Sequence, residues 1–244
     1  MKNYFKYILQ KILGFENYLF IFSLIKIKTL EFDRKENDFL YFLNMIPNHG
    51  IVLDIGANIG IMTVKLAKRL PHTKILAFEP VHHNLHALRK ITAYYKLNNV
   101  KIFDYALGNE EGKVKMVMPV LSSVKMQGLS HVMHKSITEF NEGETFDVPI
   151  YKLDTFPELA NNPEPISAIK LDVENFEYFV LKGGEKRIKK DRPIIYTELW
   201  KNKNRTDCIN FAKSLNYSVK VFQNKTLVDF DEEKHQTQNF FFIP

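Results

Sequence analysis

The feature that most constrains the fold of this chain is a ten-residue segment at residues 51–60, which reads IVLDIGANIG. Its first three residues are aliphatic, as in a strand buried on both faces, and residues 61–70 then carry apolar side chains at helical spacing. Gly56 and Gly60 allow a tight turn in which the backbone approaches a ligand closely. A strand, a glycine turn and a helix in this order indicate a nucleotide-binding βα unit.

A second apolar run, at residues 75–78, ends in Glu79, about 20 residues beyond the turn, where an acid holds ribose hydroxyls. The turn lacks the middle glycine that makes room for the pyrophosphate of a dinucleotide, which disfavours an NAD-dependent oxidoreductase. It carries Asp54 and Asn58 instead, and an acid and an amide suit a ligand with a positive or zwitterionic group. The residues therefore predict S-adenosylmethionine as the cofactor.

Composition favours one domain in a reducing compartment. With 244 residues, of which 45% are hydrophobic, the chain can form one large domain with a small extension. We expect an N-terminal extension at residues 1–35 and a catalytic domain at residues 36–244. The single cysteine, Cys208, excludes an internal disulfide framework, so we expect a cytoplasmic protein. The net charge is +6, and the lysines are spread along the chain, as on an ordinary solvated surface.

The first thirty residues allow two interpretations. Apolar side chains recur on one helical face, with lysines off that face: Tyr4, Phe5, Ile8, Leu9, Ile12 and Leu13. A second apolar run at residues 18–25 is too short to span a bilayer, and no secretory cleavage site is present. The helix either packs, over the open edge of the sheet or on a neighbouring subunit in a homo-oligomer, or lies at the inner face of a membrane. We favour packing.

Strand and helix signals alternate from Ile51 onward, which predicts βαβ units and a mostly parallel sheet. Strands are expected at residues 51–54, 74–79, 100–105, 113–120, 149–153, 166–171, 193–199, 217–222 and 238–243. Helices are expected at residues 36–46, 61–70, 83–95, 176–189 and 205–215, with a weak point at Gly183 and Gly184. Residues 121–145 interrupt the pattern, which is typical of a lid or a substrate loop.

Acidic residues stand at the ends of the predicted strands, and ligands of open α/β sheets bind outside those carboxyl ends. These residues are Asp54, Glu79, Asp104, Asp172 and Glu198. Asp172 is the strongest candidate for chemistry because it ends a buried strand near the glycine turn. Glu174 follows it, and Glu177 is either functional or a solvated helix residue in a salt bridge.

Several linked motifs resemble the FkbM-family methyltransferases over roughly residues 40–243. They are LDIGANIG at 53–60, FEP at 78–80 with Asn84 and Leu88, IKLDVE at 169–174 with Glu177, LKG at 181–183, RPII at 192–195 with Glu198, and Asn239 before the last apolar run. The resemblance implies a class I S-adenosylmethionine-dependent methyltransferase, with an α/β, Rossmann-like fold, a seven-stranded, mostly parallel sheet and helices on both faces. It also implies transfer usually to oxygen, with sugars and polyketide-derived hydroxyls as common acceptors.

The chain departs from that family at Asn175 and Phe176, where a glycine generally follows Asp-Val-Glu. Asparagine tolerates a left-handed backbone, so the turn can form, but the added bulk alters the acceptor pocket. We therefore expect acceptor specificity at this turn, in residues 121–145 and in the first thirty residues. The expected acceptor is a hydroxyl of a glycan or glycolipid, with a small secondary metabolite as the alternative.

The expected roles follow the strand ends. Those for the cofactor are Asp54, Gly56, Asn58 and Gly60 at the methionine part, Glu79 at the ribose, Asp104 and Ala106 beside the adenine, and Asp172 near the methyl group. An acceptor hydroxyl needs a base within hydrogen-bond reach to remove its proton. The candidates for the catalytic groups are Asp172, Glu174, Glu198 and His131.

Four alternatives are disfavoured. Asp172 and Glu198 are hard oxygen ligands for a divalent metal that would hold an acceptor diol, although we do not favour a metal. The histidines at 82, 83, 86, 131 and 134 lack the cysteines or second ligand pair of a zinc site. A nucleic-acid methyltransferase would need a proline-rich motif after the fourth strand or a Pro-Cys nucleophile, and the chain has neither. A scaffold that binds the cofactor without catalysis is the fourth.

Overall fold

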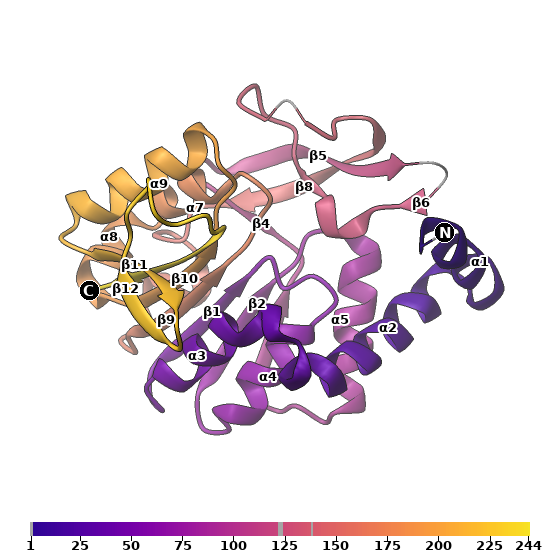
Figure 1. The fold of residues 1–244 in the computed structure, drawn as a ribbon, viewed down its shortest axis with the longest axis horizontal. Coiled ribbons are helices and arrows are strands. Elements are labelled where there is room, and N and C mark those ends of the chain that lie inside the picture. The colour runs from indigo at the N-terminus through magenta and orange to yellow at the C-terminus, as the bar shows by residue number, and fades with distance from the viewer. Residues whose placement is uncertain (1, 122–123, 138) are drawn as a thin grey trace.

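The computed structural model describes residues 2–121, 124–137 and 139–244, and its main sheet has eight strands in the order β12-β11-β13-β10-β9-β1-β2-β3 (Figure 1). These strands are β1 (Ile51–Ile55), β2 (Lys74–Phe78), β3 (Val100–Phe103), β9 (Ile166–Leu171), β10 (Ile194–Glu198), β11 (Ser218–Gln223), β12 (Thr226–Asp229) and β13 (Asn239–Ile243). The prediction of a seven-stranded sheet is therefore wrong by one strand. The missed strand, β12, is a short edge strand with no buried residue, so no apolar run reveals it.

The parallel strands bring the predicted site residues together. Strands β1, β2, β3, β9 and β10 run parallel, whereas β13 is antiparallel to both β10 and β11. Successive residues face opposite sides, so Ile75 and Leu76 belong to different hydrophobic cores. Because parallel strands share one direction, the carboxyl ends of β1, β2, β9 and β10 meet at the same edge of the sheet.

Helices cover both faces of the sheet, as expected. On one face lie α3 (Asn37–Met45), α4 (Ile61–Arg69) and α5 (His82–Tyr94), and on the other lie α6 (Pro157–Ala160), α7 (Glu177–Gly183), α8 (Glu185–Asp191) and α9 (Lys203–Ser214). The helix expected at 176–189 is therefore two helices. A Cβ on Gly183 would lie 1.8 Å from the carbonyl oxygen of Gly108, so only glycine permits this close backbone approach.

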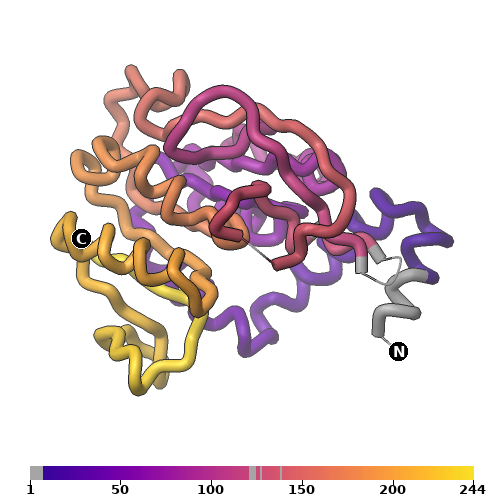
Figure 2. The backbone as a smooth tube through the Cα atoms, turned by 90° about the horizontal axis from the view of Figure 1, so that it is seen from above, coloured from indigo at the N-terminus to yellow at the C-terminus, as the bar shows by residue number. Residues whose placement is uncertain are grey.

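A second, smaller sheet lies over the carboxyl ends of the main sheet (Figures 1 and 2). It contains β4 (Ala106–Leu107), β5 (Gly112–Leu121), β6 (Val124–Lys125), β7 (His131–Val132) and β8 (Gly143–Tyr151), with the 3-10 helix η3 (Gln127–Leu129) between β6 and β7. Half of the described residues at 121–145 therefore lie in short strands or in η3, where the sequence showed only an interruption of the pattern, and a role as a lid or substrate loop stays a prediction. The two-residue strands β6 and β7 are too short for a periodic pattern, and only their pairing with β5 defines them.

The N-terminal segment packs on helices. It comprises α1 (Lys2–Leu13), α2 (Phe15–Thr29) and two 3-10 helices, η1 (Leu30–Phe32) and η2 (Arg34–Glu36). Leu19 packs beside Ile59 and α5, and Ile27 packs between α4 and α5, so α2 covers these helices and not the open edge of the sheet. The predicted positions of Tyr4 and Phe5 concern side chains outside the described ones. No helix among the described residues is both long and apolar enough to cross a membrane.

Candidate active site

The glycine turn after β1 joins three strand ends. The backbone N–H groups of Gly56 and Ala57 donate to the carbonyl oxygen of Phe78 at the end of β2, at 3.0 and 2.9 Å. Gly56 has a φ of 78°, and a Cβ there would lie 1.8 Å from the carbonyl oxygen of Asp172, just past β9. A glycine is therefore required at this position, both for its left-handed backbone and for the contact with the loop that carries Asp172.

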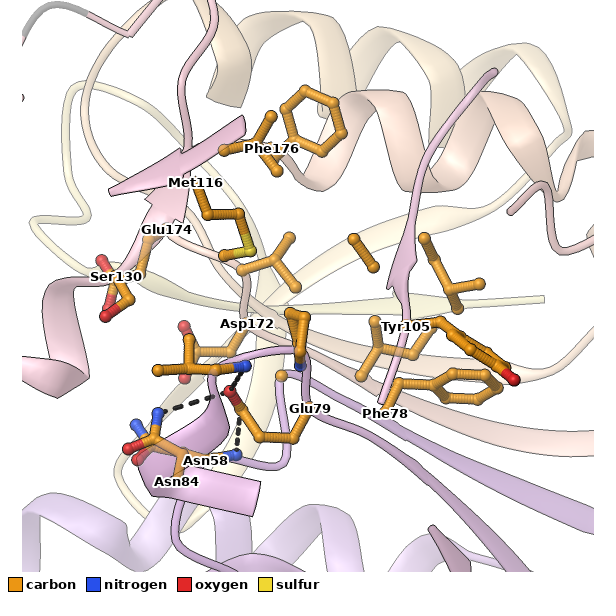
Figure 3. A pocket seen from close by; sticks show the side chains of 18 of the residues that line it. Asn58, Phe78, Glu79, Asn84, Tyr105, Met116, Ser130, Asp172, Glu174 and Phe176 are labelled. Carbon is orange, nitrogen blue, oxygen red and sulfur yellow. Dashed lines mark hydrogen bonds between the residues drawn. The ribbon is translucent and has the colours of Figure 1, made fainter. Parts of the chain in front are cut away.

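Two cavities meet at this turn, and both are lined by Gly56, Asn58, Gly128 and Asp172. The first, which we call the Glu79 cavity, has a volume of about 50 Å³. Its other notable lining residues are Phe78, Glu79, Tyr105, Ala106, Met116, Ser130, Val132, Glu174 and Phe176 (Figure 3). The second, which we call the Lys26 cavity, has a volume of about 260 Å³. It is also lined by Phe22, Lys26, Leu30, Asp33, Glu36, Ile61, Met62 and Lys170.

Glu79 is held rigidly at the edge of the first cavity. One carboxylate oxygen accepts from the backbone N–H of Asn58 and the other from that of Val81, both at 2.8 Å (Figure 3). Burial raises the pKa of Glu79 to about 7, against the opposing effect of these hydrogen bonds. The carboxylate is thus fixed by the backbone before any ligand binds, and its oxygens have further lone pairs to accept from hydroxyl groups.

Two polar side-chain atoms at the Glu79 cavity have no hydrogen-bond partner among the described residues. Asn58 Oδ1 and Ser130 Oγ are both buried and form no hydrogen bond with the described residues. Buried polar atoms in folded proteins nearly always have a partner, so these atoms indicate space for a polar ligand. Ser130 lies between η3 and β7 and Asn58 lies in the glycine turn, so such a ligand would lie between these two segments.

A second group of carboxylates, which we call the carboxylate wall, lines the Glu79 cavity beside Glu79. Asp172 and Glu174 line the Glu79 cavity, and the backbone of Glu174 is left-handed, with a φ of 54°. Burial and the neighbouring carboxylates of Asp172, Glu198 and Glu177 raise the pKa of Glu174 to about 9. Burial and Asp172 likewise raise the pKa of Glu198 to about 7. Such a wall resists full ionisation unless a cation binds against it.

Lys170, which was not among the predicted site residues, lines the Lys26 cavity. Its side chain is buried, its Nζ donates to the carbonyl oxygen of Gly56 at 2.7 Å, and it lies 3.5 Å from Asp54 and 3.7 Å from Asp172. Burial opposes the charge of Lys170, but these carboxylates raise its pKa overall, so the ammonium is retained. A lysine inside the otherwise apolar run 166–171 was the available signal, because lysine is seldom buried without a partner.

Glu177 is not the solvated helix residue that one interpretation allowed. It is only 1% exposed, and its carboxylate accepts from the backbone N–H groups of Val173 and Asn175 and from the amide of Asn204, at 2.9, 3.2 and 2.6 Å. Burial raises its pKa to about 7. Glu177 therefore fixes the turn that presents Glu174, and Asn175 adopts the expected left-handed backbone, with a φ of 74°.

Three predicted residues near the turn lie outside both cavities. Asp54 is fully buried and accepts from Thr63 Oγ1 at 2.6 Å, which ties β1 to α4. A Cβ on Gly60 would lie 2.7 Å from Ile91, so that glycine serves helix packing. Asp104 is exposed and lies 3.8 Å from Arg89, while its neighbour Ala106 does line the Glu79 cavity.

Two predicted catalytic candidates also lie outside both cavities. The ring nitrogens of His131 lie 2.9 Å from the carbonyl oxygen of Leu129 and 3.0 Å from Asn141 Oδ1, so the imidazole secures the small sheet. Glu198, at the end of β10, does not line either cavity, although its charge acts on Glu174 and Asp172. The structure therefore brings Asp172 and Glu174 together at the cavity, and leaves His131 apart from them.

The histidines of α5 have a partner from the N-terminal segment. Glu16 of α2 lies 3.6 Å from His83 and 3.4 Å from His86. In the described part of the chain, a group of three side chains with potential metal-ligand atoms within 4.8 Å consists of Glu16, His82 and His83. That group does not include Asp172 or Glu198, the two acids of the disfavoured metal alternative.

Comparisons with known proteins identify the family of this chain. Residues 54–235 match the Methyltransferase FkbM domain. Over 167 residues, the chain is 26% identical to Methyltransferase 1 of Beauveria bassiana (strain ARSEF 2860), covering 63% of this chain and 67% of that protein. It is also 26% identical to Methyltransferase sdnD of Sordaria araneosa over 167 residues, covering 60% of this chain and 64% of that protein.

A solved structure shares the fold. The crystal structure of Methyltransferase FkbM from Methylobacillus flagellatus KT superimposes with a TM-score of 0.54 at 14% identity, over 82% of this chain and 45% of that chain. The match thus spans about two thirds of the two relatives and less than half of the solved chain. It confirms the predicted α/β methyltransferase fold, and the domain match shows that the chain belongs to the FkbM methyltransferase family.

Proposed function

We propose that this protein is an S-adenosylmethionine-dependent methyltransferase that methylates a hydroxyl oxygen on a sugar of a glycan or glycolipid. The observation that carries this proposal is the Glu79 cavity, where a fixed acid at the end of β2 faces two free polar atoms and a carboxylate wall. S-adenosylmethionine, when bound, supplies a methyl group on a positively charged sulfonium. An acidic wall is complementary to that charge.

The residues that line the two cavities indicate which part of S-adenosylmethionine each cavity would hold. Glu79 would accept from the ribose hydroxyls, and Tyr105 and Ala106 would border the adenine. The charged residues that line the Glu79 cavity are all acidic, so the donor's α-carboxylate has no counter-ion there. The Lys26 cavity contains two lysines, and the ammonium of Lys170 is already surrounded by Gly56, Asp54 and Asp172. We therefore assign the α-carboxylate to Lys26, whose ion-pair partner among the described residues is Asp33, at 3.2 Å.

The acceptor would enter beside the carboxylate wall. A hydroxyl is a weak nucleophile until it loses its proton, so a base must lie within hydrogen-bond reach. Asp172 lies where the two cavities meet, and Glu174 lies further along the same wall. We assign Asp172 to orienting the acceptor beside the methyl group and Glu174 to accepting the proton. A cation against this wall would favour the ionised form of Glu174, which is the form that accepts a proton.

The surroundings favour a polyhydroxylated acceptor. Carboxylates accept hydrogen bonds from several hydroxyls at once, and aromatic rings cover the apolar face of a sugar. Trp200 lies two residues after Glu198, and its ring contacts that of Phe140 in the segment between β7 and β8, with centroids 6.1 Å apart. Phe176 adds an aromatic ring to the lining of the Glu79 cavity itself. A small hydroxylated metabolite would satisfy the same chemistry and is tested in parallel.

The experiment has two steps. Calorimetric titration of the purified protein with S-adenosylhomocysteine tests donor binding, with NADH as the comparison ligand. Release of S-adenosylhomocysteine from S-adenosylmethionine is then measured with panels of oligosaccharides, glycolipids, small phenols and RNA, and the methylated atom is identified by mass spectrometry and NMR. Methylation of a sugar oxygen is expected. Binding of NADH alone, or methyl transfer to nitrogen or carbon, would refute the proposal.

A further inference from the structure

The N-terminal segment exposes a stripe of apolar side chains. Helix α2 buries Leu19 and Ile27 against α4 and α5, and its opposite side faces solvent. Ile21 and Ile25 lie one turn apart on that outer side, and Phe32 of η1 follows at helical spacing. Ile25 is 56% exposed and Phe32 is 85% exposed. Single exposed apolar residues are ordinary, but three along one side of two consecutive helices mark an interaction surface. We call these three residues the α2 stripe.

Basic side chains border the α2 stripe. Lys28, Arg34 and Lys35 are exposed, and none of them forms an ion pair with the described residues. The nearby acids are already engaged, because Asp33 pairs with Lys26 and Glu31 pairs with Lys65. The first 35 residues contain seven basic and three acidic residues, a net charge of +4 out of +6 for the whole chain. Free positive charge is therefore concentrated where apolar side chains are exposed.

We propose that the α2 stripe docks the protein on the surface of a membrane that contains anionic lipids. Apolar side chains on one side of an interfacial helix enter the boundary between headgroups and acyl chains, while lysines and arginines contact lipid phosphates. The charge argues against a second copy of the chain as the occupant, because two such segments would repel each other. The inference does not depend on which acceptor is methylated.

The α2 stripe lies next to residues that line the Lys26 cavity. Phe32 stands between Leu30 and Asp33, both of which line the Lys26 cavity. On α2, Phe22 and Lys26 line the same cavity and lie beside Ile21 and Ile25. A membrane against the α2 stripe would therefore lie next to the wall of the Lys26 cavity. The N-terminal segment would serve both as a wall of that cavity and as the contact with lipid.

The test is co-sedimentation of the full-length protein with vesicles. Vesicles of equal parts phosphatidylglycerol and phosphatidylcholine should bind at least ten-fold better than vesicles of phosphatidylcholine alone, and salt should weaken the binding. The double variant Ile25→Ser with Phe32→Ser should bind the phosphatidylglycerol vesicles at least ten-fold more weakly. The same loss of vesicle binding is expected for Arg34→Glu with Lys35→Glu. The matched control is Lys189→Glu with Lys190→Glu on α8, which removes the same charge far from the stripe and should lose less than three-fold.

Thermal melting and S-adenosylhomocysteine binding are measured on each variant, so that misfolding or failure of the donor site is recognised separately. Equal binding to both kinds of vesicle, unchanged binding of the two stripe variants, or an equal loss in the α8 control would overturn the proposal. So would a concentration-dependent dimer, seen by analytical ultracentrifugation without vesicle binding, that the Ile25→Ser and Phe32→Ser changes dissociate. That last result would assign the stripe to a second copy of the chain.

Discussion

The two cavities that meet at Asp172 come from different parts of the chain. Every residue lining the Glu79 cavity falls within the family match at 54–235. Five of the fourteen residues lining the Lys26 cavity precede that match and lie in the segment from α2 to η2: Phe22, Lys26, Leu30, Asp33 and Glu36. The first cavity is thus a property of the family's domain, whereas the second depends on how the N-terminal segment packs against it. The predictions below test that division.

The largest effect is expected at the turn that both cavities share. In Gly56→Ala the new Cβ would meet the carbonyl oxygen of Asp172 at 1.8 Å, and the left-handed backbone would be strained as well. We expect a loss of about 4 kcal/mol or more in the free energy of unfolding, measured by urea denaturation. Gly128→Ala is the matched control, because its nearest neighbour is Asn58 Nδ2 at 3.9 Å. Similar losses in both variants would contradict the argument from close approach.

The next effect concerns the carboxylate wall. Glu174→Gln should lower kcat by about 10²-fold or more while S-adenosylhomocysteine affinity changes little, because it removes the proton acceptor and keeps the shape. His131→Gln should leave kcat nearly unchanged and lower the melting temperature, because that imidazole joins Leu129 and Asn141. The ratio of the two kcat values, from a methyl-transfer assay, decides the assignment. A larger loss for His131→Gln would reverse it.

A smaller effect should separate the two cavities directly. Lys26→Met should weaken S-adenosylhomocysteine binding about ten-fold, the size of one lost charge-assisted hydrogen bond. Binding of 5′-methylthioadenosine, which has no α-carboxylate, should stay the same in a parallel titration. Lys28→Met, on the exposed side of α2, serves as the control. Equal losses for both ligands would show that Lys26 supports the fold and not the carboxylate.

The smallest effect is a pH dependence of the unliganded protein. The pKa values of Glu79, Glu177 and Glu198 are raised to about 7 and that of Glu174 to about 9, from 4.5. A carboxyl with a raised pKa in the folded state contributes most to stability below about pH 4.5, and that contribution is lost as the pH rises through the folded-state value. The free energy of unfolding should therefore fall from pH 5 to pH 9, and Glu174→Gln should flatten the upper part of the curve. A rising curve between pH 7 and pH 9 would contradict these shifts.

Much of the Glu79 cavity could be predicted because its residues are set by local patterns. Buried parallel strands are continuous apolar runs, and the residue that ends each run must lie at the same edge of the sheet. Glu79 and Asp172, which follow two such runs, line the Glu79 cavity, and Glu174 follows Asp172 there. Asp54 and Asp104 also stand at strand ends, but their side chains contact Thr63 and Arg89, because the run itself does not show which side chain faces the cavity.

What the sequence determined by itself was the order of elements, the family and the shared edge of the sheet, since short-range spacing and turn chemistry set these. Only the tertiary structure decided that Glu177 is buried, that His131 is tied to the small sheet, and that Lys26 shares a cavity with Asp172. These facts depend on contacts between segments far apart in the chain, such as α2 with α4 and α5. A glycine turn can be recognised from the residues next to it in the sequence. The wall of a cavity is formed by residues that come together only in the folded chain.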